Sequence, residues 1–343
     1  MTTQKDGKTR RSILIQVAAA AAAVSGGATA VQAQARVADM TVRKILAVAV
    51  GGDSDRTLNI DKNNSSAVLP MVRPYITGLI EWLNDPTVNT DLDATPKTFP
   101  LGDNSSGYTI AYREVTMANL NVANPDVFSL SNLKGIDCIV CMSTFVGEKA
   151  AVSTITTPDI PIVVITSDPS NNKFGQNVCG VSAIRPQLTG GHGLHEFKKR
   201  SGLTKIYGLN RVGYNPSEQA KKTIGKGIPS TRWVDVNDDD TNFLTKISAL
   251  IKTNAGLLVM PVDRFFGYGD QIVAAAAPMP TYWSTTDWPK TLKGGYGYPQ
   301  RVCGQYMAQR VASIWSSTSG IDIPDEPFLT VDPKEVKSVY NVS

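Results

Sequence analysis

The strongest constraint on the fold of this chain is a regular alternation of strand-like and helix-like segments that begins near Arg43. Short β-branched or apolar runs, such as residues 44–50 and 162–165, alternate with longer segments of helical spacing, such as residues 67–85. This alternation predicts parallel, doubly wound sheets. We expect further strands at residues 108–115, 135–144, 205–212, 231–236, 256–262 and 280–285. Because the pattern repeats after an irregular stretch at residues 169–182, the sequence predicts two α/β lobes of comparable size.

Polar residues directly follow the apolar run at residues 162–165. Thr166, Ser167 and Asp168 would lie where this strand leaves the sheet, at its carboxyl end. In open α/β sheets that edge binds ligands. Asp and Pro are also ordinary turn residues, so a simple turn is the alternative interpretation.

The first 35 residues have the features of a signal peptide. A basic leader precedes an alanine-rich apolar stretch at residues 13–24, and Ala33-Gln34-Ala35 supplies a small-x-small cleavage site. Thr9-Arg10-Arg11-Ser12 also resembles the twin-arginine signal, so Sec and twin-arginine export both remain open. We therefore expect residues 1–35 to be removed and the mature chain to be located in the periplasm.

Composition and motifs argue against several function classes. The net charge is +4, part of it belongs to the leader, and a nucleic-acid binder would show a basic patch or stripe. The sequence has no phosphate-binding loop, no dinucleotide-binding glycine pattern and no nucleophile elbow. His192 and His195 are the only two histidines, and no third metal ligand accompanies them. We therefore expect no enzyme, no cofactor, no metal and no nucleic-acid partner.

The sequence predicts structural roles, and no catalytic or metal-binding role, for the cysteine pair Cys138 and Cys141 and for a run of acidic residues. Cys138 and Cys141 are three positions apart in a strand-like run, so their side chains should face opposite sides of a sheet as buried free thiols. A disulfide between Cys179 and Cys303 is left open by the sequence. Asp238-Asp239-Asp240 precedes a predicted helix, and we expect these carboxylates to favour the positive end of its dipole.

Polar residues at the ends of other predicted strands suggest a binding site. Ser143 and Thr144 stand between a strand and a helix, where hydroxyls and backbone N–H groups suit a carboxylate, or else serve as plain N-caps. Asp263 would suit an ammonium group, or else pair with a surface cation. Tyrosines near residue 297 would form aromatic walls, or else belong to the core. The ligand-binding residues that we predict are Asp53, Ser143, Thr144, Ser167, Asp168, Asp263, Tyr296 and Tyr298.

Several segments resemble those of a known family. Residues 159–182, DIPIVVITSDPS…VCGVS, are similar to a family segment that reads Ile-Pro-Ile-Val, Asp-Pro and Thr-Gly-Val-Ser. Residues 294–315, GGYGYPQRVCGQYMAQRVASIW, resemble the turn and helix near the C-terminus of that family, and residues 323–336 resemble its closing turn, strand and helix. The family is the solute-binding proteins of bacterial ABC transporters with the type I periplasmic-binding fold. The likeness covers nearly the whole mature chain, but the loop at residues 51–53 and the insert at residues 86–107 depart from it.

This resemblance implies an α/β fold of two doubly wound parallel-sheet lobes joined by a hinge. Residues 36–166 and 293–325 would form the N-terminal lobe, and residues 167–292 and 326–343 the C-terminal lobe. It implies a monomer that captures a small polar solute, an amino acid or related carboxylate, in the cleft between the lobes. The partner would be the permease of an ABC transporter in the inner membrane. A sensor that signals to a membrane receptor kinase and an exported enzyme remain the alternatives.

Overall fold

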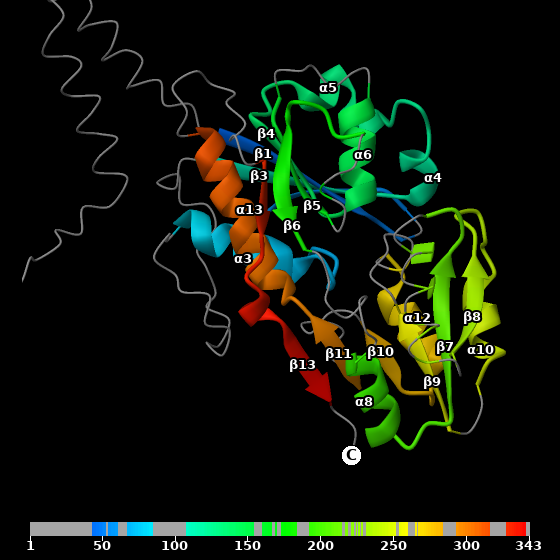
Figure 1. Ribbon diagram of the computed structural model, residues 1–343. Helices are drawn as coiled ribbons and strands as arrows, with labels where there is room; N and C mark the ends of the chain where they lie inside the picture. Colours follow the sequence, from blue (N-terminus) through cyan, green and yellow to red (C-terminus); the bar gives the residue numbers. More distant parts are fainter. Residues whose placement is uncertain are drawn as a thin grey trace, which may run out of the picture. The chain divides into compact units, whose positions relative to one another are not determined.

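The computed structural model contains two sheets of mainly parallel strands, with helices packed on both faces of each (Figure 1). This arrangement confirms the α/β fold class that the alternation predicts. The structure describes residues 43–52, 54–60, 67–84, 108–153, 160–166, 169, 173–183, 192–214, 217–218, 221–222, 224, 226, 228, 231–251, 254–259, 265, 267–283, 293–315 and 327–340.

The first sheet has seven strands. Their order across the sheet is β12 (Phe328–Thr330), β6 (Val178–Ser182), β5 (Ile162–Thr166), β4 (Cys138–Cys141), β1 (Arg43–Val50), β3 (Tyr108–Val115) and β2 (Arg56–Ile60). The strands from β12 to β1 pair in parallel, and β2 runs antiparallel to β3. The sequence did not predict β2, because only Leu58 and Ile60 of its five residues are apolar and only Ile60 is buried.

Both faces of the first sheet are buried, which explains its nearly continuous apolar strands. Ile45 and Ala47 of β1 face one apolar cluster, and Leu46 and Val48 face another. Figure 1 shows the helices of the first cluster, α3 (Arg73–Asn84) and α13 (Gln300–Trp315), on one side of the sheet. The other side carries α4 (Met117–Leu120), the 3₁₀ turn η2 (Asp126–Phe128), α5 (Leu130–Leu133) and α6 (Thr144–Val152).

Helices α3 and α13 touch through their backbones. A Cβ atom on Gly78 would lie 1.9 Å from the carbonyl oxygen of Arg301, so only glycine allows this approach. Beside this contact, Arg301 Nε donates to Glu81 Oε2 at 2.6 Å, and the Glu81 side chain is fully buried. The last long helix is thus tied to the first sheet by close packing and by a buried ion pair.

The second sheet has six strands. Their order is β13 (Lys337–Tyr340), β11 (Gly294–Gly297), β10 (Thr281–Trp283), β9 (Ala255–Val259), β7 (Lys205–Arg211) and β8 (Thr231–Val236), and only β13 runs antiparallel to its neighbour. Helices α10 (Phe243–Ser248) and α12 (Gly269–Ala276) cover one face. Helix α8 (His192–Arg200) covers the other, where Phe197 packs on Tyr282.

Three strands belong to a different sheet from the one that the expected lobe boundaries imply. β6 and β12 belong to the first sheet, although the expected boundaries put residues 167–292 and 326–343 in the second lobe. β11 belongs to the second sheet, whereas α13 packs on the first. The chain therefore passes between the sheets after β6, after β11 and after β12. These strands are only three to five residues long, and their apolar content gives no signal for which sheet they join.

All four cysteines are free thiols and are buried. Cys138 lies in the cluster beneath α3 and α13, and Cys141 in the cluster beneath α6, as their spacing predicted. Cys179 and Cys303 form no disulfide. Among the helices in the described part of the chain, none has the length and apolar content needed to span a bilayer.

Candidate binding site at the strand ends

The start of α6 lies directly after β4, at the carboxyl edge of the first sheet. The Ser143 hydroxyl accepts a hydrogen bond of 3.2 Å from the Val146 N–H, so Ser143 is the N-cap of the helix. The Thr144 hydroxyl lies 3.0 Å from the hydroxyl of Thr166, the last residue of β5, and both side chains are buried. A capped helix start with adjacent hydroxyls is suited to binding an anion.

Arg211 is the last residue of β7 and brings a cation to the same region. Its Nε and Nη2 donate to the two carboxylate oxygens of Asp238 at 2.7 and 2.8 Å, a bidentate pair in which the arginine side chain is only 4% exposed. The guanidinium carbon lies 4.6 Å from the centre of the Phe145 ring and 4.7 Å from that of Tyr214. Since Phe145 is the second residue of α6, the arginine and the helix start are neighbours.

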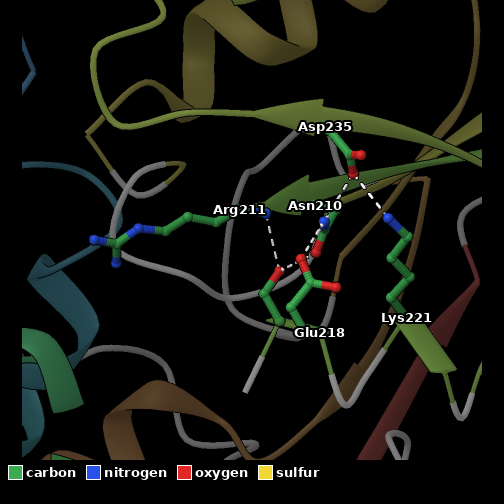
Figure 2. Close-up of polar contacts among 6 residues, drawn as sticks. Asn210, Arg211, Glu218, Lys221 and Asp235 are labelled. Carbon is green, nitrogen blue, oxygen red and sulfur yellow. Dashed lines mark hydrogen bonds and ion pairs between the residues drawn. The ribbon is translucent and has the colours of Figure 1, made fainter. Parts of the chain in front are cut away.

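A buried amide holds the backbone that carries Arg211. The backbone N–H of Arg211 donates to the Ser217 hydroxyl at 2.9 Å, and this hydroxyl donates to Asn210 Oδ1, also at 2.9 Å. The Arg211 side chain points away from Asn210 and Glu218 (Figure 2). Asn210 and Ser217 are both almost fully buried, so they fix the direction in which the arginine leaves the strand.

Charged groups complete this network. The Asn210 side-chain N–H₂ group donates to carboxylate oxygens of Glu218 and Asp235, each at 2.8 Å, and Lys221 donates to the same Asp235 oxygen at 2.9 Å (Figure 2). Hydrogen bonds from Lys221 and Asn210 lower the pKa of Asp235 below its usual value. Every atom of the Asn210 amide is thereby used, which makes the amide a positioning element.

The loop after β1 and the segment before α12 meet at glycine residues. A Cβ atom on Gly267 would lie 2.3 Å from the carbonyl oxygen of Gly51, which follows β1, and a Cβ on Gly52 would lie 3.0 Å from the carbonyl oxygen of Gly267. The loop after β1 therefore contacts the segment before α12 through the backbone atoms of these glycines. A side chain larger than hydrogen at residue 267 would push the two segments apart.

A cavity of about 10 Å³ lies beside the α6 start. Its lining is mainly apolar and consists of Ala49, Val50, Met71, Val72, Tyr75, Met142 and Ser143. Met71 is almost fully buried and packs with the apolar cluster beneath α10 and α12. Met71 and Met142 are the two lining residues with flexible thioether side chains.

The structure describes some of the predicted ligand-binding residues and not others. Ser143 and Thr144 lie together at the α6 start, with Ser143 serving as the N-cap. Tyr298 is 7% exposed and belongs to the apolar cluster between the first sheet and α13, which is its alternative role in the core. The Tyr296 backbone is part of β11, but its side chain lies outside the described residues. Also outside them are Asp53, Ser167, Asp168 and Asp263.

Asp238 and Asp240 have partners that the sequence did not indicate. Asp238 pairs with Arg211, and Asp240 pairs with Lys246 and accepts a hydrogen bond from the Asn242 N–H. Asp240 therefore lies at the N-terminal end of α10, and both carboxylates also have side-chain cations as partners. The available signal for Arg211 was its place at the end of a mainly apolar strand, a position like that which selected Ser143.

Solved structures with related folds cover most of the chain. A conserved domain protein from Vibrio cholerae matches with a TM-score of 0.61 and 14% identity, over 88% of this chain and 92% of that one. An ABC domain from Streptococcus pneumoniae in complex with L-Trp matches with a TM-score of 0.59 and 13% identity, over 87% and 92%. The chain has the type I periplasmic-binding fold.

A third structure with the type I periplasmic-binding fold is a carbohydrate transporter solute binding protein from Agrobacterium radiobacter, in complex with D-arabinose. It matches with a TM-score of 0.51 and 14% identity, over 88% of this chain and 95% of that one. No family model and no curated protein sequence matches the chain. In this type I periplasmic-binding fold, Arg211 and α6 lie at the carboxyl ends of parallel strands, where α/β sheets bind ligands.

Proposed function

We propose that this protein is the exported solute-binding component of an ABC uptake transporter. It captures a small polar ligand, an amino acid or related carboxylate, in the cleft between its two lobes and delivers it to a membrane permease. The observation that carries this proposal is the meeting of Arg211 with the start of α6 in a fold shared with solute-binding proteins.

The combination of Arg211 with the start of α6 is suited to an anionic group on the ligand. A helix start offers backbone N–H groups and the positive end of the helix dipole, and an arginine adds a planar set of donors. Ser143 and Thr144 would hold the carboxylate, and Arg211 would stabilise its charge. The rings of Phe145 and Tyr214 keep the guanidinium in an apolar surrounding, where its attraction for an anion is stronger than in water.

Other residues at strand ends would complete the site. Asp263 would accept the ammonium group of an amino acid, and Tyr296 would contact the body of the ligand. Asp53, Ser167 and Asp168 would line the site at the ends of their strands. Tyr298 is left out of this set because it packs in the core. The mature protein would act as a monomer in the periplasm, after removal of residues 1–35.

A thermal-shift screen of the mature chain tests the function. The protein is refolded from denaturant, so that no co-purified solute remains, and is screened with amino acids, organic acids, sugars, aromatic acids and polyamines. A ligand at about 100 times its dissociation constant adds about 2.7 kcal/mol of stability. For a mature chain of about 300 residues we expect a shift of roughly 3–5 °C with amino acids or related carboxylates. A shift with sugars alone would contradict the proposal that the ligand is a carboxylate. A shift with none of these solutes would contradict the proposed binding function.

A further inference from the structure

A third buried hydroxyl, that of Ser182, lies on the same face of the first sheet as the hydroxyls of Thr144 and Thr166 at the start of α6. Ser182 is the last residue of β6 and stands opposite Thr166, the last residue of β5, in the parallel register. Val164 and Val178 belong to the apolar cluster beneath α6. Since side chains alternate along a strand, Thr166 and Ser182 point to that same face. The hydroxyls of Thr144, Thr166 and Ser182 therefore form a row along the carboxyl edge of the first sheet.

The Ser182 hydroxyl differs from the other two. Thr144 and Thr166 lie within hydrogen-bonding distance of each other, at 3.0 Å. The Ser182 side-chain oxygen is buried and has no hydrogen-bond partner among the described residues, although the residue is only 2% exposed. A buried hydroxyl without a partner is unfavourable, so a partner beyond the described residues, such as a water molecule or a solute, would stabilise it.

The spacing of the row restricts what such a solute contains. Neighbouring strands lie about 4.8 Å apart, so Ser182 is one strand spacing from Thr166 and further from the α6 start. A carboxylate whose oxygens are held by Thr144 and the N–H groups of the first turn of α6 would leave Ser182 to another part of the ligand. A second polar group on the carbon next to the carboxylate would extend the hydrogen-bonding reach toward Ser182.

We propose that Ser182 is a specificity-determining residue that selects carboxylates with a hydrogen-bonding substituent at the α-carbon, an amino or hydroxyl group. This inference rests on the proposed function, because it places the carboxylate at the α6 start. The serine hydroxyl accepts from an ammonium group and donates to or accepts from a hydroxyl, so either substituent satisfies it. An acid without the substituent leaves Ser182 without a partner.

Paired probes test this selection. Binding of L-tryptophan, L-leucine and L-phenylalanine is compared by calorimetry with binding of indole-3-propionate, 4-methylpentanoate and 3-phenylpropionate, which lack only the amino group. In the wild-type protein we expect each amino acid that binds to do so at least about 10-fold more tightly than its counterpart. In Ser182→Ala we expect the amino acid to lose about 10-fold in affinity and the counterpart to lose nothing.

Thr231→Val is the matched control. The Thr231 hydroxyl is likewise buried without a partner among the described residues, but it lies at the first residue of β8, the opposite end of a strand. We expect it to leave both affinities unchanged. In Ser182→Ala, an equal loss for both members of a pair, or no loss, overturns the role of Ser182. A lower melting temperature of ligand-free Ser182→Ala would also overturn it, because that result identifies a hydroxyl with a structural partner. If the wild-type protein binds neither member of any pair, the proposed amino-acid ligand is wrong, and the inference fails with it.

Discussion

The guanidinium carbon of Arg211 lies 4.6 Å from the centre of the Phe145 ring, so a residue that ends a strand of the second sheet contacts a residue that begins a helix of the first. A cation–π contact of this kind contributes about 0.5–2 kcal/mol. Together with the bidentate pair to Asp238, it fixes a cation beside the α6 start. The proposed anion site therefore depends on residues from both sheets.

Arg211→Lys tests this arrangement. Lysine keeps the positive charge but loses the planar set of donors that pairs with both oxygens of Asp238. We expect calorimetry to show affinity for the amino-acid ligand reduced about 10- to 100-fold. Arg200→Lys is the matched control, because Arg200 pairs with Glu196 on an exposed helix surface. Wild-type affinity in Arg211→Lys would show that the arginine has only a structural role.

Two substitutions of Ser143 separate capping from binding. Ser143→Ala removes the hydroxyl that accepts from Val146 and should lower the free energy of unfolding by about 1 kcal/mol. Ser143→Asp retains a good N-cap, so stability should stay near that of the wild type, but its carboxylate repels an anionic ligand. Chemical denaturation and calorimetry measure the two effects. Ligand binding that survives in Ser143→Asp would place the carboxylate elsewhere.

Gly267→Ala tests the contact between the two glycine segments. The added Cβ would lie 2.3 Å from the Gly51 carbonyl oxygen, and overpacking of this kind costs about 1–3 kcal/mol. If ligand binding requires the two segments to meet, affinity should fall about 5- to 100-fold. Gly175→Ala is the control, since its Cβ would meet only the movable side chain of Asn177 at 3.3 Å. Equal affinities in the two variants would remove this contact from the binding mechanism.

Asp235 gives a prediction for the pH dependence of stability. Because hydrogen bonds from Lys221 and Asn210 lower its pKa in the folded state, its contribution is present above its ordinary pKa of 3.8 and is lost as the pH falls below it. The contribution is at most about 1 kcal/mol, since the Asp235 side chain is 55% exposed. We expect Asp235→Asn to lower the melting temperature at pH 7 and to have a smaller effect at pH 3. A difference that is the same at both pH values would contradict the shifted ionisation.

Local features of the sequence predicted the parts of the structure that depend on nearby residues. The alternation of apolar runs predicted the strands and helices, and the position of Ser143 between a strand and a helix predicted its capping role. The opposite orientations of Cys138 and Cys141 followed from the two-residue period of a strand.

Contacts between distant segments could not be predicted in this way. Arg211 ends β7, Asp238 follows the neighbouring strand β8, and Phe145 lies in another part of the chain, so their meeting depends on how the sheets assemble. The membership of β6, β11 and β12 depends on hydrogen bonds to strands far away in the sequence. A polar segment such as β2 forms a strand because β3 offers it a partner, not because of its own composition.

The burial of every cysteine has a practical consequence for optical work on this protein. Burial raises the pKa of the Cys138, Cys141 and Cys179 thiols, that of Cys179 to about 12, so the reactive thiolate is scarce at neutral pH. Cysteines introduced at the exposed positions Val122 and Val212 would be the thiols that maleimide dyes reach readily. Two dyes can therefore be attached, one at each position, to report binding of the proposed solute by fluorescence, with no native cysteine to replace.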